Sequence, residues 1–187
     1  MKTLVQAARN FAAIAGRLRG DVRGVSAVEF ALMAPLMLTM YLGSVEISQG
    51  VSASRKVTLV TRTVADLVAQ VSSINNTDMT NTLNAATAVI APFSSSNLRV
   101  VVSSVTIDST GKATVAWSDT RNGTARAKGS TITLPTALAV PNSSLIFSEV
   151  QFNYTPTVGY VISGTLALKD QIYMRPRLSD SVTRTTT

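Results

Sequence analysis

The stretch RGVSAVEFALMAPLMLTMYLGSVEISQG, residues 23–50, is the most informative part of the sequence. It has the apolar composition of a membrane-spanning helix, but it carries a carboxylate at Glu29, between Val28 and Phe30. An ionised side chain in the hydrocarbon of a bilayer costs ~2.5–3.5 kcal/mol on insertion scales. Two explanations are open at this point: Glu29 lies at the membrane interface, or it meets a positively charged partner.

The uncharged part of this stretch, residues 30–45, is short for a bilayer. As a helix it would rise ~24 Å, whereas the hydrocarbon core is ~30 Å thick. The span becomes sufficient over residues 25–47, with Glu29 and Glu46 near its two edges. Pro35 is tolerable because neighbouring membrane helices can satisfy the carbonyl that it frees. We therefore predict a transmembrane segment over residues 25–47. Its residues include Ala31, Leu32, Pro35, Leu36, Leu38 and Leu42.

Residues 1–24 form a basic leader, with five Lys and Arg residues against Asp21. The leader accounts for most of the net charge of +7, so the high isoelectric point does not indicate nucleic acid as a partner. It fits a weak amphipathic helix on an anionic membrane surface, or a disordered tail, and both readings are open. A removed secretory signal fits less well, because the apolar run continues into a further helix.

The distribution of basic residues predicts the orientation of the membrane segment. The leader is more basic than the residues just after the segment, where Arg55, Lys56 and Arg62 occur. The positive-inside rule then keeps residues 1–24 in the cytoplasm and exports the chain that follows residue 47.

Residues 48–73 continue the helix with an apolar stripe. Residues of this stripe recur at alternating spacings of three and four, which places them on one helix face. They are Gly50, Ala53, Val57, Val60, Val64, Leu67 and Val71. We predict one helix from about residue 25 to residue 73, ~70 Å long. Its exported half packs on its own domain, or alternatively on a coiled-coil partner.

The rest of the chain indicates an antiparallel sheet. A polar loop over residues 72–82 and a short helix over residues 80–91, stopped by Pro92, precede five segments rich in β-branched residues. Those segments cover residues 97–108, 112–118, 129–134, 144–154 and 164–174. The predicted class is α+β: a long N-terminal helix packed against a C-terminal antiparallel β-sheet domain, residues 74–187. A hairpin turn is expected at Asp108 to Lys112.

No combination of residues in the sequence indicates a catalytic reaction. Without Cys or His, the chain has no thiolate or imidazole metal ligand, no disulfide and no imidazole base. The Ser109 to Lys112 string lacks the flanking residues of a phosphate loop. We predict no catalytic residue, no metal and no cofactor, and hence no enzyme. Four Asn-x-Ser/Thr sequons occur as chance matches, at Asn75, Asn122, Asn142 and Asn153.

The string GVSAVEF, residues 24–30, resembles the prepilins and pseudopilins of type IV pilus systems. In those proteins a basic leader is cut after a Gly, and Glu is the fifth residue of the mature chain. The resemblance implies that a prepilin peptidase cuts between Gly24 and Val25, which makes Glu29 the fifth residue.

Within that superfamily, residues 23–38 resemble the TadE-like pseudopilins of the tight-adherence (Flp) pilus. A second motif of these proteins is similar to the end of this chain, at Phe152, Tyr154, Pro156, Arg175, Pro176 and Arg177. The resemblance implies a minor pilin in the bacterial inner membrane with a periplasmic β domain, because the major pilins are little more than the helix. Implied partners are the bilayer, other pilin subunits, the prepilin peptidase and the pilus assembly platform.

The new amino group at Val25 would lie four residues before Glu29, on the same helix face. Where the amine belongs to a neighbouring subunit instead, its attraction to Glu29 fixes the axial register between subunits. Glu29 and Phe30 are thus the predicted assembly residues. The alternative is an unprocessed membrane-anchored periplasmic binding module.

Overall fold

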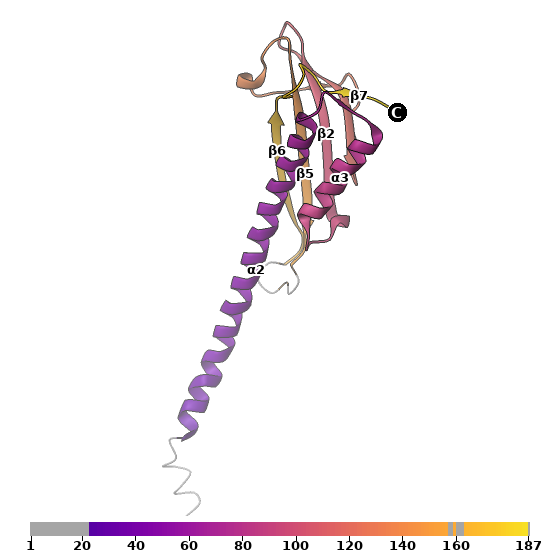
Figure 1. Cartoon of the computed structure of the whole chain (residues 1–187). Coiled ribbons are helices and arrows are strands. Elements are labelled where there is room, and N and C mark those ends of the chain that lie inside the picture. The colour runs from indigo at the N-terminus through magenta and orange to yellow at the C-terminus, as the bar shows by residue number, and fades with distance from the viewer. Residues whose placement is uncertain (1–22, 157–158, 160–162, 187) are drawn as a thin grey trace, which may run out of the picture. The chain divides into compact units, whose positions relative to one another are not determined.

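A computed structural model describes residues 23–156, 159 and 163–186. The interpretations of residues 1–22 therefore lie outside the described residues. A long helix and a shorter one accompany an antiparallel sheet, which confirms the predicted α+β class (Figure 1). The helices and strands are α2 (Arg23–Ala69), β1 (Ser73–Ile74), α3 (Asn76–Ile90), β2 (Leu98–Ile107), β3 (Ala113–Arg121), β4 (Thr131–Ile132), β5 (Ser143–Tyr154), β6 (Leu166–Met174) and β7 (Thr183–Arg184). The chain divides into two compact units between Val45 and Glu46, and α2 contributes to both.

The main sheet has the strand order β4-β3-β2-β5-β6, and every neighbouring pair is antiparallel. Its five strands lie within or beside the five segments predicted from β-branched residues. The hairpin between β2 and β3 also forms as predicted: the Asp108 carboxylate accepts hydrogen bonds from the backbone N–H groups of Thr110 and Lys112, at 2.8 and 3.0 Å. The Thr110 hydroxyl also donates a 2.6 Å hydrogen bond to this carboxylate. This hydroxyl bond, followed by the backbone bonds, lowers the pKa of Asp108.

One face of the sheet packs against α2 and α3. Register places Val100 of β2 opposite Val150 of β5, and Leu98 opposite Phe152. All four are buried in one cluster with residues of both helices. Alternate residues of a strand point to opposite faces, so this apolar set leaves a second face for other contacts.

The second face carries a smaller apolar cluster at one end and a polar surface at the other. Val105, Leu145 and Phe147 are buried there, with Leu134 and Leu138 of the β4–β5 connection packed against them. The Phe147 ring stacks on Tyr173 of β6 at a centroid distance of 4.3 Å. This arrangement covers the apolar end and leaves the polar end of the face open.

The predicted polar loop over residues 72–82 is wrong. It contains β1 and the first half of α3, which begins at Asn76 instead of near residue 80. Asn75 is the N-cap, and its side-chain oxygen accepts a 2.8 Å hydrogen bond from the backbone N–H of Asp78. Asn is among the strongest N-cap residues, so this short polar string starts a helix instead of separating two elements.

The long helix ends earlier than expected, at Ala69 instead of about residue 73. The backbone N–H of Arg177 donates a 2.9 Å hydrogen bond to the Ala69 carbonyl. A helix leaves its last four carbonyls without intrahelical partners. The end of α2 is therefore capped by a segment that lies far away in the sequence.

Candidate functional site

The predicted cleavage bond, between Gly24 and Val25, lies within α2. A Cβ atom on Gly24 would meet no other atom within 4 Å, so the surroundings of this glycine are open. A Gly in a helix costs ~1 kcal/mol relative to Ala. The surroundings of the bond are open, but the helix must open locally before the backbone can become extended.

Glu29 and Phe30 lie two turns from the start of the helix, and both are exposed. Phe30 is 69% exposed. Within the described residues, Glu29 makes no hydrogen bond or ion pair. Val25 precedes it by four residues, so the two share a helix face. The arrangement presents a carboxylate and an aromatic ring to whatever surrounds this helix.

Most side chains of the apolar segment that follows are exposed as well. Leu32, Leu36 and Leu38 are among its exposed residues, Ala31 and Pro35 are exposed too, and Leu42 is half-buried. By length and composition, α2 contains a segment able to cross a membrane, and no residue of that window is buried. A helix that is apolar all round requires an apolar environment. Lipid or other membrane helices can supply it.

The helix passes through Pro35 without a break. Proline has no N–H, so the carbonyl four residues earlier loses its intrahelical donor. The Thr39 hydroxyl donates a 2.8 Å hydrogen bond to the Pro35 carbonyl. This bond satisfies the Thr39 hydroxyl within the helix, as a lipid environment demands. It does not involve the Ala31 carbonyl, which is the one that Pro35 frees.

The comparison with known families falls on this same region. Residues 24–66 match the TadE-like protein family. The match contains the predicted cleavage bond, Glu29 and the apolar segment, and it confirms the predicted resemblance to TadE-like proteins of the tight-adherence pilus system. No curated protein and no solved structure gives a significant match to the chain.

The second half of the TadE-like segment contributes the helix stripe to the domain core. Val57, Val60 and Val64 are buried there. Leu67, however, is 37% exposed, and Val68 is fully buried in its place. A strict seven-residue repeat drifts by ~20° per heptad on a straight helix, so the centre of the buried face turns away from Leu67 and toward Val68. Val71 follows the end of α2 and packs against the core only partly.

Tyr154, from the second predicted motif, anchors the beginning of this packed half of α2. It is buried, and its hydroxyl lies 3.5 Å from the side-chain oxygen of Gln49. Glu46 is only 1% exposed. Burial raises the pKa of Tyr154, and the negative charge of Glu46 raises that pKa further. The sequence predicts Glu46 near the membrane edge, but no local pattern indicates that it is buried in the folded unit.

Arg177 of the same motif anchors the other end of α2. Its guanidinium forms an ion pair with Asp66, one turn before the helix ends. Phe152 and Pro156 are buried, Arg175 is exposed and Pro176 is half-buried. The motif thus supplies contacts at both ends of the packed helix half, although it lies outside the family match.

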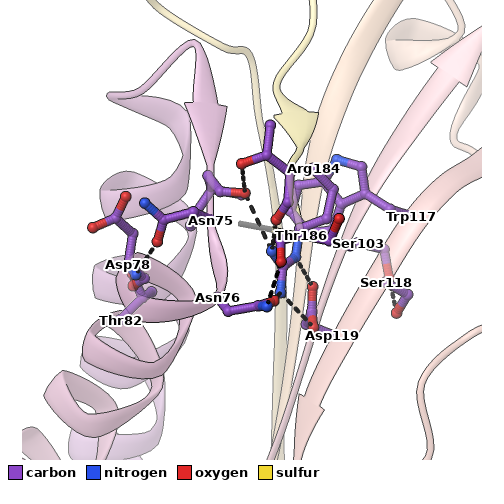
Figure 2. Close-up of polar contacts among 12 residues, drawn as sticks. Asn75, Asn76, Asp78, Thr82, Ser103, Trp117, Ser118, Asp119, Arg184 and Thr186 are labelled. Carbon is purple, nitrogen blue, oxygen red and sulfur yellow. Dashed lines mark hydrogen bonds and ion pairs between the residues drawn. The ribbon is translucent and has the colours of Figure 1, made fainter.

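A third contact holds the C-terminal segment against the domain (Figure 2). The Arg184 guanidinium donates to the Asp119 carboxylate of β3 at 2.8 Å and to the Asn76 side chain of α3 at 2.7 Å. The indole N–H of Trp117 donates a 2.7 Å bond to the Val182 carbonyl. Together with the parallel β1–β7 pair, these contacts join α3, β3 and the C-terminal segment. Neither the pair nor the contacts were predicted from the sequence.

Arg184→Ala is expected to lower the free energy of unfolding by about 2 kcal/mol. It removes charge-assisted hydrogen bonds worth ~1.5–3 kcal/mol and leaves the partly buried Asp119 carboxylate without its partner. For a chain of this size, the melting temperature should fall by about 4–8 °C. Thermal unfolding of the full chain in detergent, followed by Trp117 fluorescence, measures the change. Arg55→Ala, which removes an exposed arginine of α2, is the control. An equal, small shift in both variants would contradict the role of Arg184.

The four sequons have structural explanations. Asn75 caps α3. Asn122 and Asn142 have positive φ angles of 53° and 56°, a conformation that Asn tolerates better than most residues. The Asn153 side chain accepts a hydrogen bond from Gln151 at 3.1 Å. Within the described residues, no group of three or more acidic side chains could hold a metal ion.

Proposed function

We propose that this chain is a pseudopilin or minor pilin, a structural and non-enzymatic subunit that takes part in assembly of a tight-adherence (Flp) pilus. A prepilin peptidase would first remove residues 1–24. The observation that carries the proposal is the TadE-like match over residues 24–66. The matched residues include Glu29, which is exposed on an apolar helix that continues into a folded domain, and this supports the proposal.

Cleavage gives Glu29 its partner. The reaction releases an ammonium group at Val25, and a second subunit can bring its own ammonium to Glu29 of the first. In an apolar surrounding the two charges attract far more strongly than in water, although their desolvation offsets much of that gain. A pair with one favoured geometry selects one axial offset between helices, and this offset is the proposed assembly role of Glu29. Phe30 would pack beside that contact.

The proposed location is the bacterial inner membrane, with residues 1–24 in the cytoplasm and the β domain in the periplasm. The excess of basic residues before the apolar segment supports this orientation. The proposed partners are the bilayer, other pilin subunits, the prepilin peptidase and the pilus assembly platform. The energy for extrusion would come from a separate cytoplasmic ATPase.

A second candidate is an unprocessed, membrane-anchored periplasmic binding module. One observation favours it: α2 begins at Arg23, so the peptide bond after Gly24 is helical and does not present the extended backbone that a peptidase requires. In this candidate Glu29 is an interfacial carboxylate. The two candidates differ in whether residues 1–24 remain on the protein.

Gly24→Leu is expected to reduce cleavage by more than tenfold. The larger side chain crowds the peptide bond to be cut, and it also stabilises the helix around this bond, because Leu is a much better helix former than Gly. Co-expression with a prepilin peptidase, followed by intact mass measurement, detects the loss of residues 1–24. Gly20→Leu, the same substitution four residues earlier, should be cleaved normally. If Gly24→Leu still gives the same mature product as the unmodified chain, beginning at Val25, this cleavage site is ruled out.

A further inference from the structure

The polar end of the second sheet face forms an open groove of about 600 Å³, on the side opposite to α2 and α3. Its lining comes from β2, β5 and β6 and from the connection between β3 and β4. These three strands are neighbours in the sheet (Figure 1). A volume of this size is typical of ligand-binding clefts, ~300–1,000 Å³. Its polar lining includes Arg99, Arg126, Glu149, Gln151, Lys169 and Gln171.

Two cations flank an amide across the floor of this groove. Register pairs Arg99 of β2 with Gln151 of β5, and Gln151 with Lys169 of β6. Paired residues lie on the same face, and neighbouring strands are ~4.8 Å apart. The backbones that carry the two cations are therefore ~10 Å apart, with Gln151 between them. Within the described residues, Lys169 makes no hydrogen bond or ion pair.

The other charges of the groove largely cancel or face elsewhere. Arg126 donates two hydrogen bonds to the Glu149 carboxylate, at 2.7 and 2.8 Å, and its guanidinium lies 5.3 Å from the centre of the Phe147 ring. Asp170 also lines the groove, but register pairs it with Val150 on the helix side of the sheet. A net positive charge from Arg99 and Lys169 therefore remains on the floor.

A well-defined turn holds Arg99 at one side of the groove. The Asn122 carbonyl accepts a 3.1 Å hydrogen bond from Arg99 Nε, and the Asn122 side chain donates to the carbonyls of Ser95 and Leu98. A Cβ on Gly123 would lie only 2.7 Å from Thr120 Oγ1, so a larger residue here would displace the Thr120 side chain, whose hydroxyl donates a hydrogen bond to the Val100 carbonyl. The two terminal nitrogens of Arg99 remain available for a ligand, because its Nε is already used.

We propose that this groove binds an acidic saccharide that carries carboxylates, with one carboxylate between Arg99 and Lys169. The side chains of Gln151, Gln171 and Thr124 offer the donors and acceptors that sugar hydroxyls need. A single small anion would occupy only a minor part of 600 Å³. The lining has few apolar side chains, which favours a hydroxyl-rich ligand over an apolar one. This activity goes beyond the role in pilus assembly and does not depend on leader removal.

Calorimetric titration of the full chain in a neutral detergent tests the proposal at low ionic strength. We expect trigalacturonate to bind at least tenfold more tightly than maltotriose, which has no charge. The double variant Arg99→Gln/Lys169→Gln should weaken trigalacturonate binding by about tenfold or more, because each cation contributes a charge-assisted hydrogen bond. Lys112→Gln is the control, because Lys112 is exposed in the β2–β3 turn, outside the groove.

Three results would overturn the proposal. The first is that trigalacturonate does not bind, and the second is that the double variant binds it as well as the unmodified chain does. The third is that a hexaglutamate peptide binds as tightly as trigalacturonate through the same two cations, which would assign the groove to acidic peptides instead. Unchanged thermal unfolding of the double variant confirms that any loss of binding is local.

Discussion

Glu29→Ala is expected to leave the protein in the membrane at normal abundance but to reduce its amount in the pilus fraction by at least tenfold. The exposed carboxylate of Glu29 is the proposed partner of the amino group that cleavage creates on a neighbouring subunit. Without it, that ammonium would enter an apolar surrounding unpaired, and burying an uncompensated charge costs several kcal/mol. Quantitative immunoblots of membrane and sheared pilus fractions measure the two amounts.

One further substitution separates charge from shape at position 29, and another serves as a control. Glu29→Gln keeps the size of the side chain but removes its charge, and it should show the same defect as Glu29→Ala. Ser26→Ala, one turn earlier on the helix, should incorporate normally. Normal incorporation of both Glu29 variants would refute the register role of this residue.

Val60→Asp is expected to lower the free energy of unfolding of the β-rich unit by about 4 kcal/mol or more. Val60 is 0% exposed and packs in the cluster that joins α2 to the sheet. An aspartate there must either ionise in an apolar core or raise its pKa to stay neutral, and both are costly. Because domains are stable by only ~5–15 kcal/mol, a substantial part of the protein should be unfolded or degraded.

The adjacent residue provides a matched control for this substitution. Leu59 is 53% exposed on the other side of α2, so Leu59→Asp should change the free energy of unfolding by less than about 1 kcal/mol. Urea unfolding, followed by Trp117 fluorescence, compares the two variants. Equal stability of both would contradict the packing of α2 on the sheet.

Elements with a strong local pattern could be predicted from the sequence. The apolar run and stripe indicated the long helix, and the β-branched segments with their turn residues indicated all five strands of the main sheet. One position of the stripe was predicted wrongly. A seven-residue repeat predicts that Leu67 is buried, whereas the period of a straight helix buries Val68. The start of α3 was missed because Asn75 was read only as part of a polar string.

Contacts between distant segments could not be predicted. Strands β1 and β7 have two residues each, which is too short for a periodic signal. Arg184 and Asp119 lie 65 positions apart, and nothing in their local sequence indicates the ion pair. Tyr154 and Arg177 were singled out only by resemblance, and the structure gives them roles at the two ends of the packed half of α2.

The same distinction applies to the candidate site and the groove: residues close together in the sequence could be predicted, and residues brought together by strand pairing could not. Its helix residues follow from one continuous string, so Gly24, Val25 and Glu29 could be named from the sequence. The groove depends instead on the register of three strands, which brings Arg99, Gln151 and Lys169 into one row. No spacing along the chain could predict that row, because register is set by pairing between strands.

The mass of the intact protein recovered from sheared, purified pili shows whether residues 1–24 are removed before assembly. We predict a chain that begins at Val25, with a free amino group available to a neighbouring Glu29. A chain from the same pili that still begins at Met1 would refute the proposed pairing, because Glu29 would then lack the partner that explains its position.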